Sequence, residues 1–192
     1  SGGSVTATTF AGHPGGLFAE MSEGIWAGAA IGGGSCGGGS GGSSGTITIS
    51  GGIVTAIVSS QPAPGIDPDA PPKYSAGIGK GAGTGVSVVG SSNITISGGT
   101  VFAQSPDGAG IGDGQNNDGS AIVIAISGGT VEAVSTNGAG IGGGMIEALS
   151  AMVNFETIYS GGEITISGGS VSAQSTNGAG IGSGAVIYDV EE

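Results

Sequence analysis

The sequence predicts an all-β protein, a right-handed parallel β-helix of about five coils, from three observations. First, "TNGAGIGGG" at 136–144 returns as "TNGAGIGSG" at 176–184 and, with small changes, as "PDGAGIGDG" at 106–114. Second, short runs such as "ITIS" alternate apolar and polar residues, as a strand with one buried face does. Third, the repeats show no helical periodicity. Repetition of short strands indicates a solenoid in which each repeat forms one coil.

Five repeat units appear when the chain is aligned on Ser-Gly-Gly, and they predict a single domain over residues 1–192. Their common form is S-G-G-x-V-x-A-x-S, then x-N/D-G-A-G-I-G-x-G, then a variable stretch ending in I-T-I. The sequence begins at a Ser-Gly-Gly block without a preceding Ile-Thr-Ile strand and ends soon after the fifth corner. Because both ends fall within a coil, we expect a fragment of a longer protein. Residues 186–190 would then supply either the missing strand or a short cap. The units start at Ser1, Ser50, Ser97, Ser127 and Ser167.

Alternation within each unit predicts which strand residues face the core. The threonines of "ITIS" should point outward, and the Ser-Gly-Gly between two strands should let the backbone turn through conformations that other residues avoid. Because aromatic residues make up only 4% of the chain, the core must be built from Ile, Val and Ala. The residues expected inside are Ile47, Ile49, Ile94, Ile96, Ile164, Ile166, Val131, Ala133, Val171 and Ala173.

The isoleucine of each Gly-Ile-Gly should stack on its counterpart in the next coil, about 4.8 Å away. Burial of each such side chain contributes roughly 1.5–3 kcal/mol. The flanking glycines should permit a tight corner and a close approach between successive backbones. Asn137, Asn177 and Asp107, each before a glycine, suit positions with positive φ. The expected column consists of Ile31, Ile78, Ile111, Ile141 and Ile181.

Charge excludes some partners. The net charge is −12, with two lysines, Lys73 and Lys80, and no arginine, so the basic face that nucleic acid requires is absent. An anionic membrane surface is disfavoured for the same reason. No apolar run is long enough to cross a bilayer, and the single cysteine, Cys36, rules out an internal disulfide. A strongly acidic surface suits a secreted protein and can attract calcium.

Two long insertions are the most informative functional feature. Units three to five need 14 residues from Ser-Gly-Gly to the corner isoleucine, whereas units one and two need 30 and 28. The extra residues, 10–26 and 57–74, should therefore emerge side by side from one corner. Aromatic rings beside carboxylates can bind a sugar through stacking and hydroxyl hydrogen bonds. The alternative is that Trp26 only pins its loop to the coils. The candidate ligand-binding residues are Trp26, Tyr74, Glu20, Glu23, Asp67, Asp69 and His13.

A third insertion lies in unit four, at 145–163, where the apolar spacing allows a short helix against the coil. Calcium has two candidate sites. Asp107, Asp113 and Asp118 could ligate an ion through oxygen, as could Asp67 with Asp69. The alternative is that these aspartates only form turns, which need no ion.

Catalysis has little support in the sequence. His13, near Glu20 and Glu23, could be a base, and a glycosidase would need two carboxylates across a cleft. A lone histidine in a glycine-rich loop is more often inert. Lyases on β-helices usually add basic residues to neutralise substrate carboxylates, and this chain has only two lysines and no arginine. The sequence therefore leans against an enzyme.

The "ITISGGTV" and "GAGIGGG" blocks resemble repeats in large secreted or wall-anchored β-helix proteins of Gram-positive, gut-type bacteria. The "ISGGT" element is also similar to that of bacterial carbohydrate-binding β-helix domains. This resemblance implies an extracellular location and a role in adhesion or glycan attachment. We therefore expect a non-catalytic adhesin or glycan-binding module whose partner is a polysaccharide or a cell-surface glycan, with end-to-end self-association as a further expectation. A passive stalk and a glycan-active enzyme remain alternatives.

Overall fold

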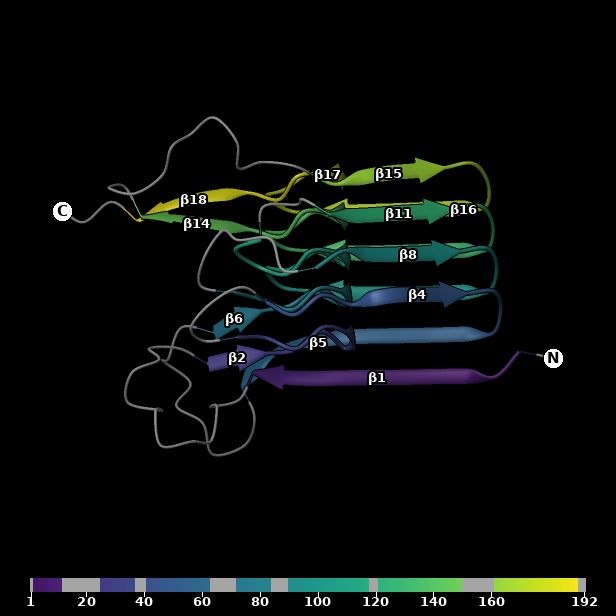
Figure 1. Cartoon of the computed structure of the whole chain (residues 1–192), viewed down its shortest axis with the longest axis horizontal. Coiled ribbons are helices and arrows are strands. Elements are labelled where there is room, and N and C mark those ends of the chain that lie inside the picture. Colours follow the sequence, from purple (N-terminus) through teal and green to yellow (C-terminus); the bar gives the residue numbers. More distant parts are fainter. Residues whose placement is uncertain are drawn as a thin grey trace.

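The protein is a parallel β-helix, as the sequence predicts (Figure 1). The computed structural model describes residues 2–11, 25–36, 41–62, 72–83, 90–117, 121–149 and 161–189. Within these ranges the regular elements are strands, and the strand pairs are parallel. The described residues include no helix long and apolar enough to span a membrane.

Three sheets run along the helix, because each of the first four coils adds one strand to all three, and coil five adds a described strand to the first and third. The first two are formed by the Ser-Gly-Gly-x-Val and Ile-Thr-Ile segments, and the third by the short Gly-Ile-Gly corners. The first contains β1 (Ser4–Ala11), β5 (Ile53–Pro62), β9 (Thr100–Ser105), β12 (Thr130–Ser135) and β16 (Ser170–Ser175). The second contains β4 (Gly45–Ile49), β8 (Ser92–Ile96), β11 (Ile122–Ile126) and β15 (Glu163–Ile166). The third contains β3 (Ile31–Gly32), β7 (Ile78–Gly79), β10 (Ile111–Gly112), β13 (Ile141–Gly142) and β17 (Ile181–Gly182).

The corner isoleucines form the predicted column. Each pairs in register with its counterpart in the neighbouring coil. The three central members, Ile78, Ile111 and Ile141, are fully buried, and Ile31 is partly buried against the same core. Ile181 is 50% exposed because no described coil covers its outer side. The column prediction is confirmed.

The inward residues of the two long sheets are also those that alternation predicts. Ile94, Ile96, Val131 and Ala133 are buried at 0–1% exposure. Burial weakens at the end of the second sheet, where Ile166 of the edge strand β15 is 40% exposed. The core is therefore a stack of aliphatic layers contributed by all three sheets.

The second glycine of each Gly-Ile-Gly allows neighbouring coils to approach. Gly79 and Gly112 have φ of 142° and 144°, where L side chains are strained. A Cβ on Gly79 would also lie far inside contact distance of the Gly112 carbonyl oxygen. The close approach predicted from the glycine pattern is confirmed.

The prediction of positive φ at Asn137, Asn177 and Asp107 is wrong. Among the described non-glycine residues, positive φ occurs at Asn116 and Ala121. The asparagines instead link successive coils through their side chains. Asn177 Nδ2 donates to Asn137 Oδ1 at 2.6 Å, and Asn137 Nδ2 donates to Asp107 Oδ1 at 2.7 Å. These residues therefore form a hydrogen-bonded ladder along the corner.

Buried serines make a second set of links that the sequence analysis missed. Ser135 Oγ donates to the Gly108 carbonyl of the preceding coil at 2.8 Å, and Ser175 Oγ donates to that of Gly138 at 2.6 Å. Ser105 makes the equivalent bond to Ser75, at 2.7 Å. Each serine satisfies a buried carbonyl that would be costly to leave unpaired. The serine repeated six residues before the corner isoleucine of coils three, four and five was the available signal.

The helix expected at the start of the third insertion is also wrong. Residues 146–149 form β14 (Ile146–Leu149), which pairs with β18 (Val186–Asp189). Short apolar runs do not distinguish strand from helix by spacing alone. Residues 186–189 thus form a strand, but it joins β14 and not the Ile-Thr-Ile sheet. Residues 150–160 lie outside the described part of the chain.

Truncation of a central corner isoleucine should cost far more than truncation of a terminal one. Ile111→Ala removes a fully buried side chain, so we expect a loss of about 2–5 kcal/mol in the free energy of unfolding. Ile181→Ala is the matched control, and because its side chain is half exposed it should cost less than about 2 kcal/mol. Urea unfolding of both variants measures the difference. Equal losses would contradict the buried column.

Candidate functional site

A layer of four short strands and one connecting segment lies beside the coils, at the left in Figure 1. Two strands, β2 (Ile25–Ala27) and β6 (Pro72–Tyr74), come from the first two coils. The other two, β14 and β18, come from coils four and five. Coil three contributes Gln115 and Asn116 between the pairs. We call these segments together the flank.

The two long insertions enter and leave the helix side by side, as predicted. At their start, β1 and β5 remain paired as far as Ala11 and Pro62. At their end, β2 and β6 pair with Trp26 opposite Lys73. The coincidence of the two insertions at one corner is therefore confirmed for the described residues. Residues 12–24 and 63–71 lie outside them, and with them His13, Glu20, Glu23, Asp67 and Asp69.

Trp26 and Tyr74 are buried, so the prediction that they are neighbouring surface rings is wrong. Their exposed fractions are 7% and 5%. Tyr74 lies opposite Ala27, one step from Trp26 in the register, and successive side chains of a strand point to opposite faces. Tyr74 packs in a small cluster with Ala27 and Val58, and its hydroxyl donates to the Ser60 carbonyl at 3.1 Å. Tyr74 therefore anchors the base of the second insertion, and Trp26 is buried at the base of the first.

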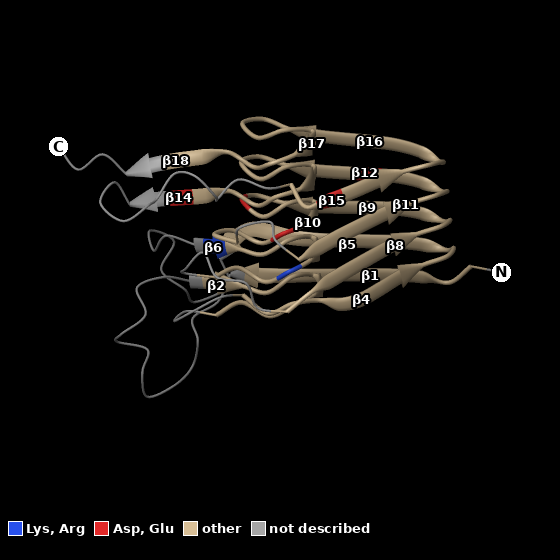
Figure 2. Cartoon of the chain, turned by 45° about the horizontal axis from the view of Figure 1, so that its top comes forward, with Lys and Arg blue, Asp and Glu red and all other residues tan. Residues whose placement is uncertain are grey.

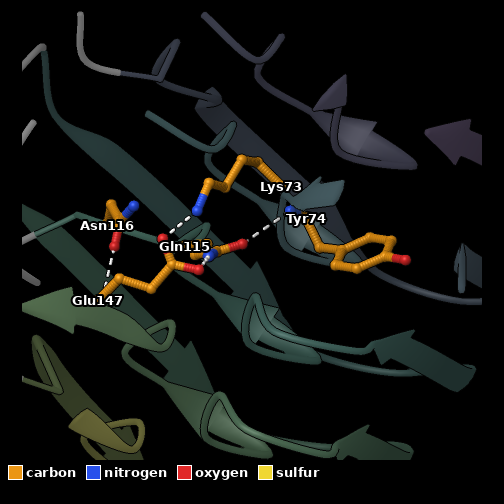
Figure 3. A network of polar contacts seen from close by, with 5 residues as sticks. All are labelled: Lys73, Tyr74, Gln115, Asn116 and Glu147. Atoms are coloured by element: carbon orange, nitrogen blue, oxygen red, sulfur yellow. Dashed lines mark hydrogen bonds and ion pairs between the residues drawn. The ribbon is translucent and has the colours of Figure 1, made fainter. Parts of the chain in front are cut away.

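Gln115 joins the two halves of the flank (Figure 3). Its Oε1 accepts a hydrogen bond from the Tyr74 backbone at 3.1 Å, and its Nε2 donates to Glu147 Oε1 at 2.8 Å. Lys73 forms an ion pair with the other oxygen of Glu147. Asn116 Oδ1 accepts from the Glu147 backbone at 2.8 Å. Side chains of β6, coil three and β14 thus form one polar network.

Backbone hydrogen bonds hold this network in place. Gln115 N donates to the Tyr74 carbonyl at 2.9 Å, and Asn116 N donates to the Met145 carbonyl at 2.8 Å. Asn116 adopts a φ of 61°, a conformation that asparagine tolerates better than most residues. Coil three has no flank strand of its own among the described residues, and this turn takes its place. The flank is therefore continuous along the five coils.

Asp107 lies beside the network. Burial raises the pKa of its carboxyl group, the hydrogen bond from Asn137 lowers it, Glu147 raises it and Lys73 lowers it. Burial also raises the pKa of Tyr74, and the charge of Asp107 raises it further. Asp107 is thus a partly desolvated acid. It stands four residues before the corner isoleucine, a position that asparagine occupies in the next two coils.

Of the expected calcium ligands, the structure describes Asp107 and Asp113, and each already has another partner. Asp113 is buried, and its Oδ1 lies 3.0 Å from the Lys80 ammonium nitrogen. The charges that affect Asp107 are those of Glu147 and Lys73, and its Oδ1 is bonded to Asn137. An oxygen facing an ammonium group in a closed interior is not placed to ligate a cation. Asp118 lies outside the described residues, and those described contain no group of three acidic, His or Cys side chains suited to a metal.

Charged residues are sparse on the two large sheets (Figure 2). Among the described side chains, these sheets carry only Glu132 and Glu163. The others lie at the flank and the adjoining corner, namely Lys73, Lys80, Asp107, Asp113 and Glu147.

Comparison with known families supports the coil assignment. The model of the beta helix repeat family matches residues 94–115, 124–145 and 164–185. Each match runs from an Ile-Thr-Ile-type strand through the Gly-Ile-Gly corner of coil three, four or five. The chain therefore carries β-helix repeats over these residues. No curated protein matches it, and no solved structure does.

Asp107→Asn should stabilise the protein at neutral pH. Because the pKa of the folded carboxyl is raised, the folded state binds a proton more tightly than the unfolded chain. The stability that this carboxyl group contributes is present at a pH below 3.8, its pKa in the unfolded chain. It is lost as the pH rises through the pKa in the folded protein. The amide cannot ionise and keeps an oxygen for Asn137. The melting temperature of the Asp107→Asn variant should therefore exceed that of the wild type at neutral pH, and the two melting temperatures should converge in acid.

Thermal unfolding between about pH 3 and pH 7 tests this difference. Glu132→Gln is the control, because it removes one negative charge from an exposed strand position. Parallel pH profiles for the wild type and Asp107→Asn would contradict the desolvation of Asp107.

Proposed function

We propose that the chain is a non-catalytic, extracellular module that binds a polysaccharide or a cell-surface glycan through the insertions of its first two coils. The observation that carries the proposal is the pairing of the insertion bases, β1 with β5 and β2 with β6. Loops that start and end on paired strands are held to the same rigid element, so their side chains can act on one ligand.

Charge narrows the class of ligand. Recognition of acidic glycans requires basic side chains that are free to bind carboxylate or sulfate. The chain has only Lys73 and Lys80, and both are in ion pairs with carboxylates. Neutral sugars present hydroxyl donors that suit carboxylate acceptors. The proposed ligand is therefore an uncharged glycan, with Glu20, Glu23, Asp67 and Asp69 as acceptors.

The burial of Trp26 and Tyr74 changes how binding would work. Neither ring presents a face to solvent for a sugar to stack on. Affinity would come from hydrogen bonds made by the loops, including those of His13, while the rings fix the position of the loop bases. Weak single-site binding is expected from such a surface.

A passive spacer is the second candidate function. The favouring observation is the continuous in-register stacking of all five corner isoleucines, which gives a stiff stack of coils whose large sheets carry few charged residues in the described part of the chain. A spacer needs no ligand and makes no use of the insertions.

Removal of the four insertion carboxylates should abolish glycan retention. The variant Glu20→Gln, Glu23→Gln, Asp67→Asn, Asp69→Asn keeps the size of each side chain. Hydrogen bonds to charged groups contribute about 1.5–3 kcal/mol each, so affinity should fall at least about tenfold. Retention on an array of neutral oligosaccharides, followed by calorimetry on the best ligand, measures this loss.

Glu132→Gln with Glu163→Gln is the control, because it changes charge only on the large sheets. Unchanged retention of the fourfold variant would remove the proposed site. A wild-type protein that retains no glycan would favour the spacer, and turnover of a retained glycan would favour an enzyme.

A further inference from the structure

A lysine and an aspartate face each other in the interior between coils two and three. Lys80 and Asp113 occupy equivalent positions, each directly after a Gly-Ile-Gly. The same position holds Gly33, Gly143 and Ser183 in the other coils. The architecture therefore needs only a small residue here, and the charged pair is a local addition.

The two side chains are closed off from solvent. Their exposed fractions are 4% for Lys80 and 0% for Asp113, and Lys80 Nζ lies 3.0 Å from Asp113 Oδ1. Their backbones are fixed by hydrogen bonds to the next coil, from Lys80 N to the Gly112 carbonyl at 2.9 Å and from Asp113 N to the Gly142 carbonyl at 2.8 Å. Fully buried lysines and aspartates are rare in proteins.

Burial of this pair is costly as long as both groups stay charged. Taking two ions out of water costs several kcal/mol per ion, and a pair of small or apolar residues would avoid that cost. Conversion of the pair into a neutral amide removes both charges. We propose that Lys80 and Asp113 are the site of a covalent modification, an isopeptide bond that ties coil two to coil three.

The reaction needs no co-reactant. A proton passes from the Lys80 ammonium to the Asp113 carboxylate, which leaves a neutral amine and a carboxylic acid. The amine nitrogen attacks Cγ of Asp113 and forms the C–N bond. The C–O bond to the hydroxyl group then breaks, and the hydroxyl leaves as water with a proton from the nitrogen. Ammonium plus carboxylate thus becomes amide plus one water, with no change in net charge.

Position and packing favour this step. Two groups held in contact on a rigid frame react as if at very high concentration, about 10⁵–10⁸ M for well-oriented pairs. Gly81, next to Lys80, packs so closely that a Cβ on it would overlap the Gly34 carbonyl, and Ala82 is fully buried. Close packing keeps out the bulk water that would return the amide to its acid and amine.

The other lysine provides an internal control. Lys73 also contacts a carboxylate, that of Glu147, but the Glu147 side chain is 41% exposed. Solvation stabilises the charges of this pair, so it should remain an ion pair. The chain therefore contains one buried and one exposed lysine–carboxylate contact and no further lysine.

Tryptic digestion of the denatured protein decides between ion pair and amide. The enzyme cuts after free lysine, and the chain has no arginine. An open chain gives three fragments, 1–73, 74–80 and 81–192. A cross-linked chain gives 1–73 and an uncut 74–192 that is lighter by one water molecule. We expect the second pattern, and an intact mass lower than the sequence sum by one water.

Asp113→Ala should restore all three fragments and the full mass, whether or not this variant folds as stably as the wild type. Glu147→Ala should keep the two-fragment pattern and the loss of one water, because it removes only the partner of Lys73. A wild-type chain with its full mass and a released 74–80 fragment would overturn the proposal. Loss of water together with release of 74–80 would also overturn it, because the dehydration would then lie elsewhere.

Discussion

The close approach of successive backbones at the Gly-Ile-Gly corners determines the rest of the structure. At Gly112 the φ of 144° and the nearby Gly142 carbonyl leave no room for a side chain. Because the backbones approach there, each corner isoleucine reaches its counterpart and the coils stack in register. Register in turn aligns the serine and asparagine links, and it brings the insertions of coils one and two to the same corner.

Repetition explains which features could be predicted. The isoleucine column, the inward valines and the shared corner of the insertions follow from patterns seen in several copies, so each copy supports the others. Trp26 and Tyr74 lie in insertions outside the repeated blocks, so no pattern shows that their strands turn them inward. The ladder through Asn137 depends on a partner 30 residues away, whereas an asparagine before a glycine indicates only local turn chemistry. Residues 145–149 have an apolar spacing that suits a helix or a strand, and pairing with β18 decided it.

The flank shows how a simple solenoid acquires local chemistry. The regular coils provide small residues and aliphatic side chains, while the flank gathers Lys73, Gln115 and Glu147 into one network. That network holds β6, the base of the second insertion, to coil three, and β6 pairs with β2, the base of the first. The two lysines each contact a carboxylate, one at the surface and one inside, and this leaves the loop carboxylates as the acceptors proposed for a neutral glycan.

The central claim is that the second corner glycine is required by geometry and not by flexibility alone. Gly112→Ala and Gly51→Ala make the same chemical change, but a Cβ on Gly51 would meet open space. Urea unfolding of the two variants tests the claim most directly. The account predicts a loss of about 3 kcal/mol or more for Gly112→Ala and less than about 1 kcal/mol for Gly51→Ala. Similar losses for both would contradict it.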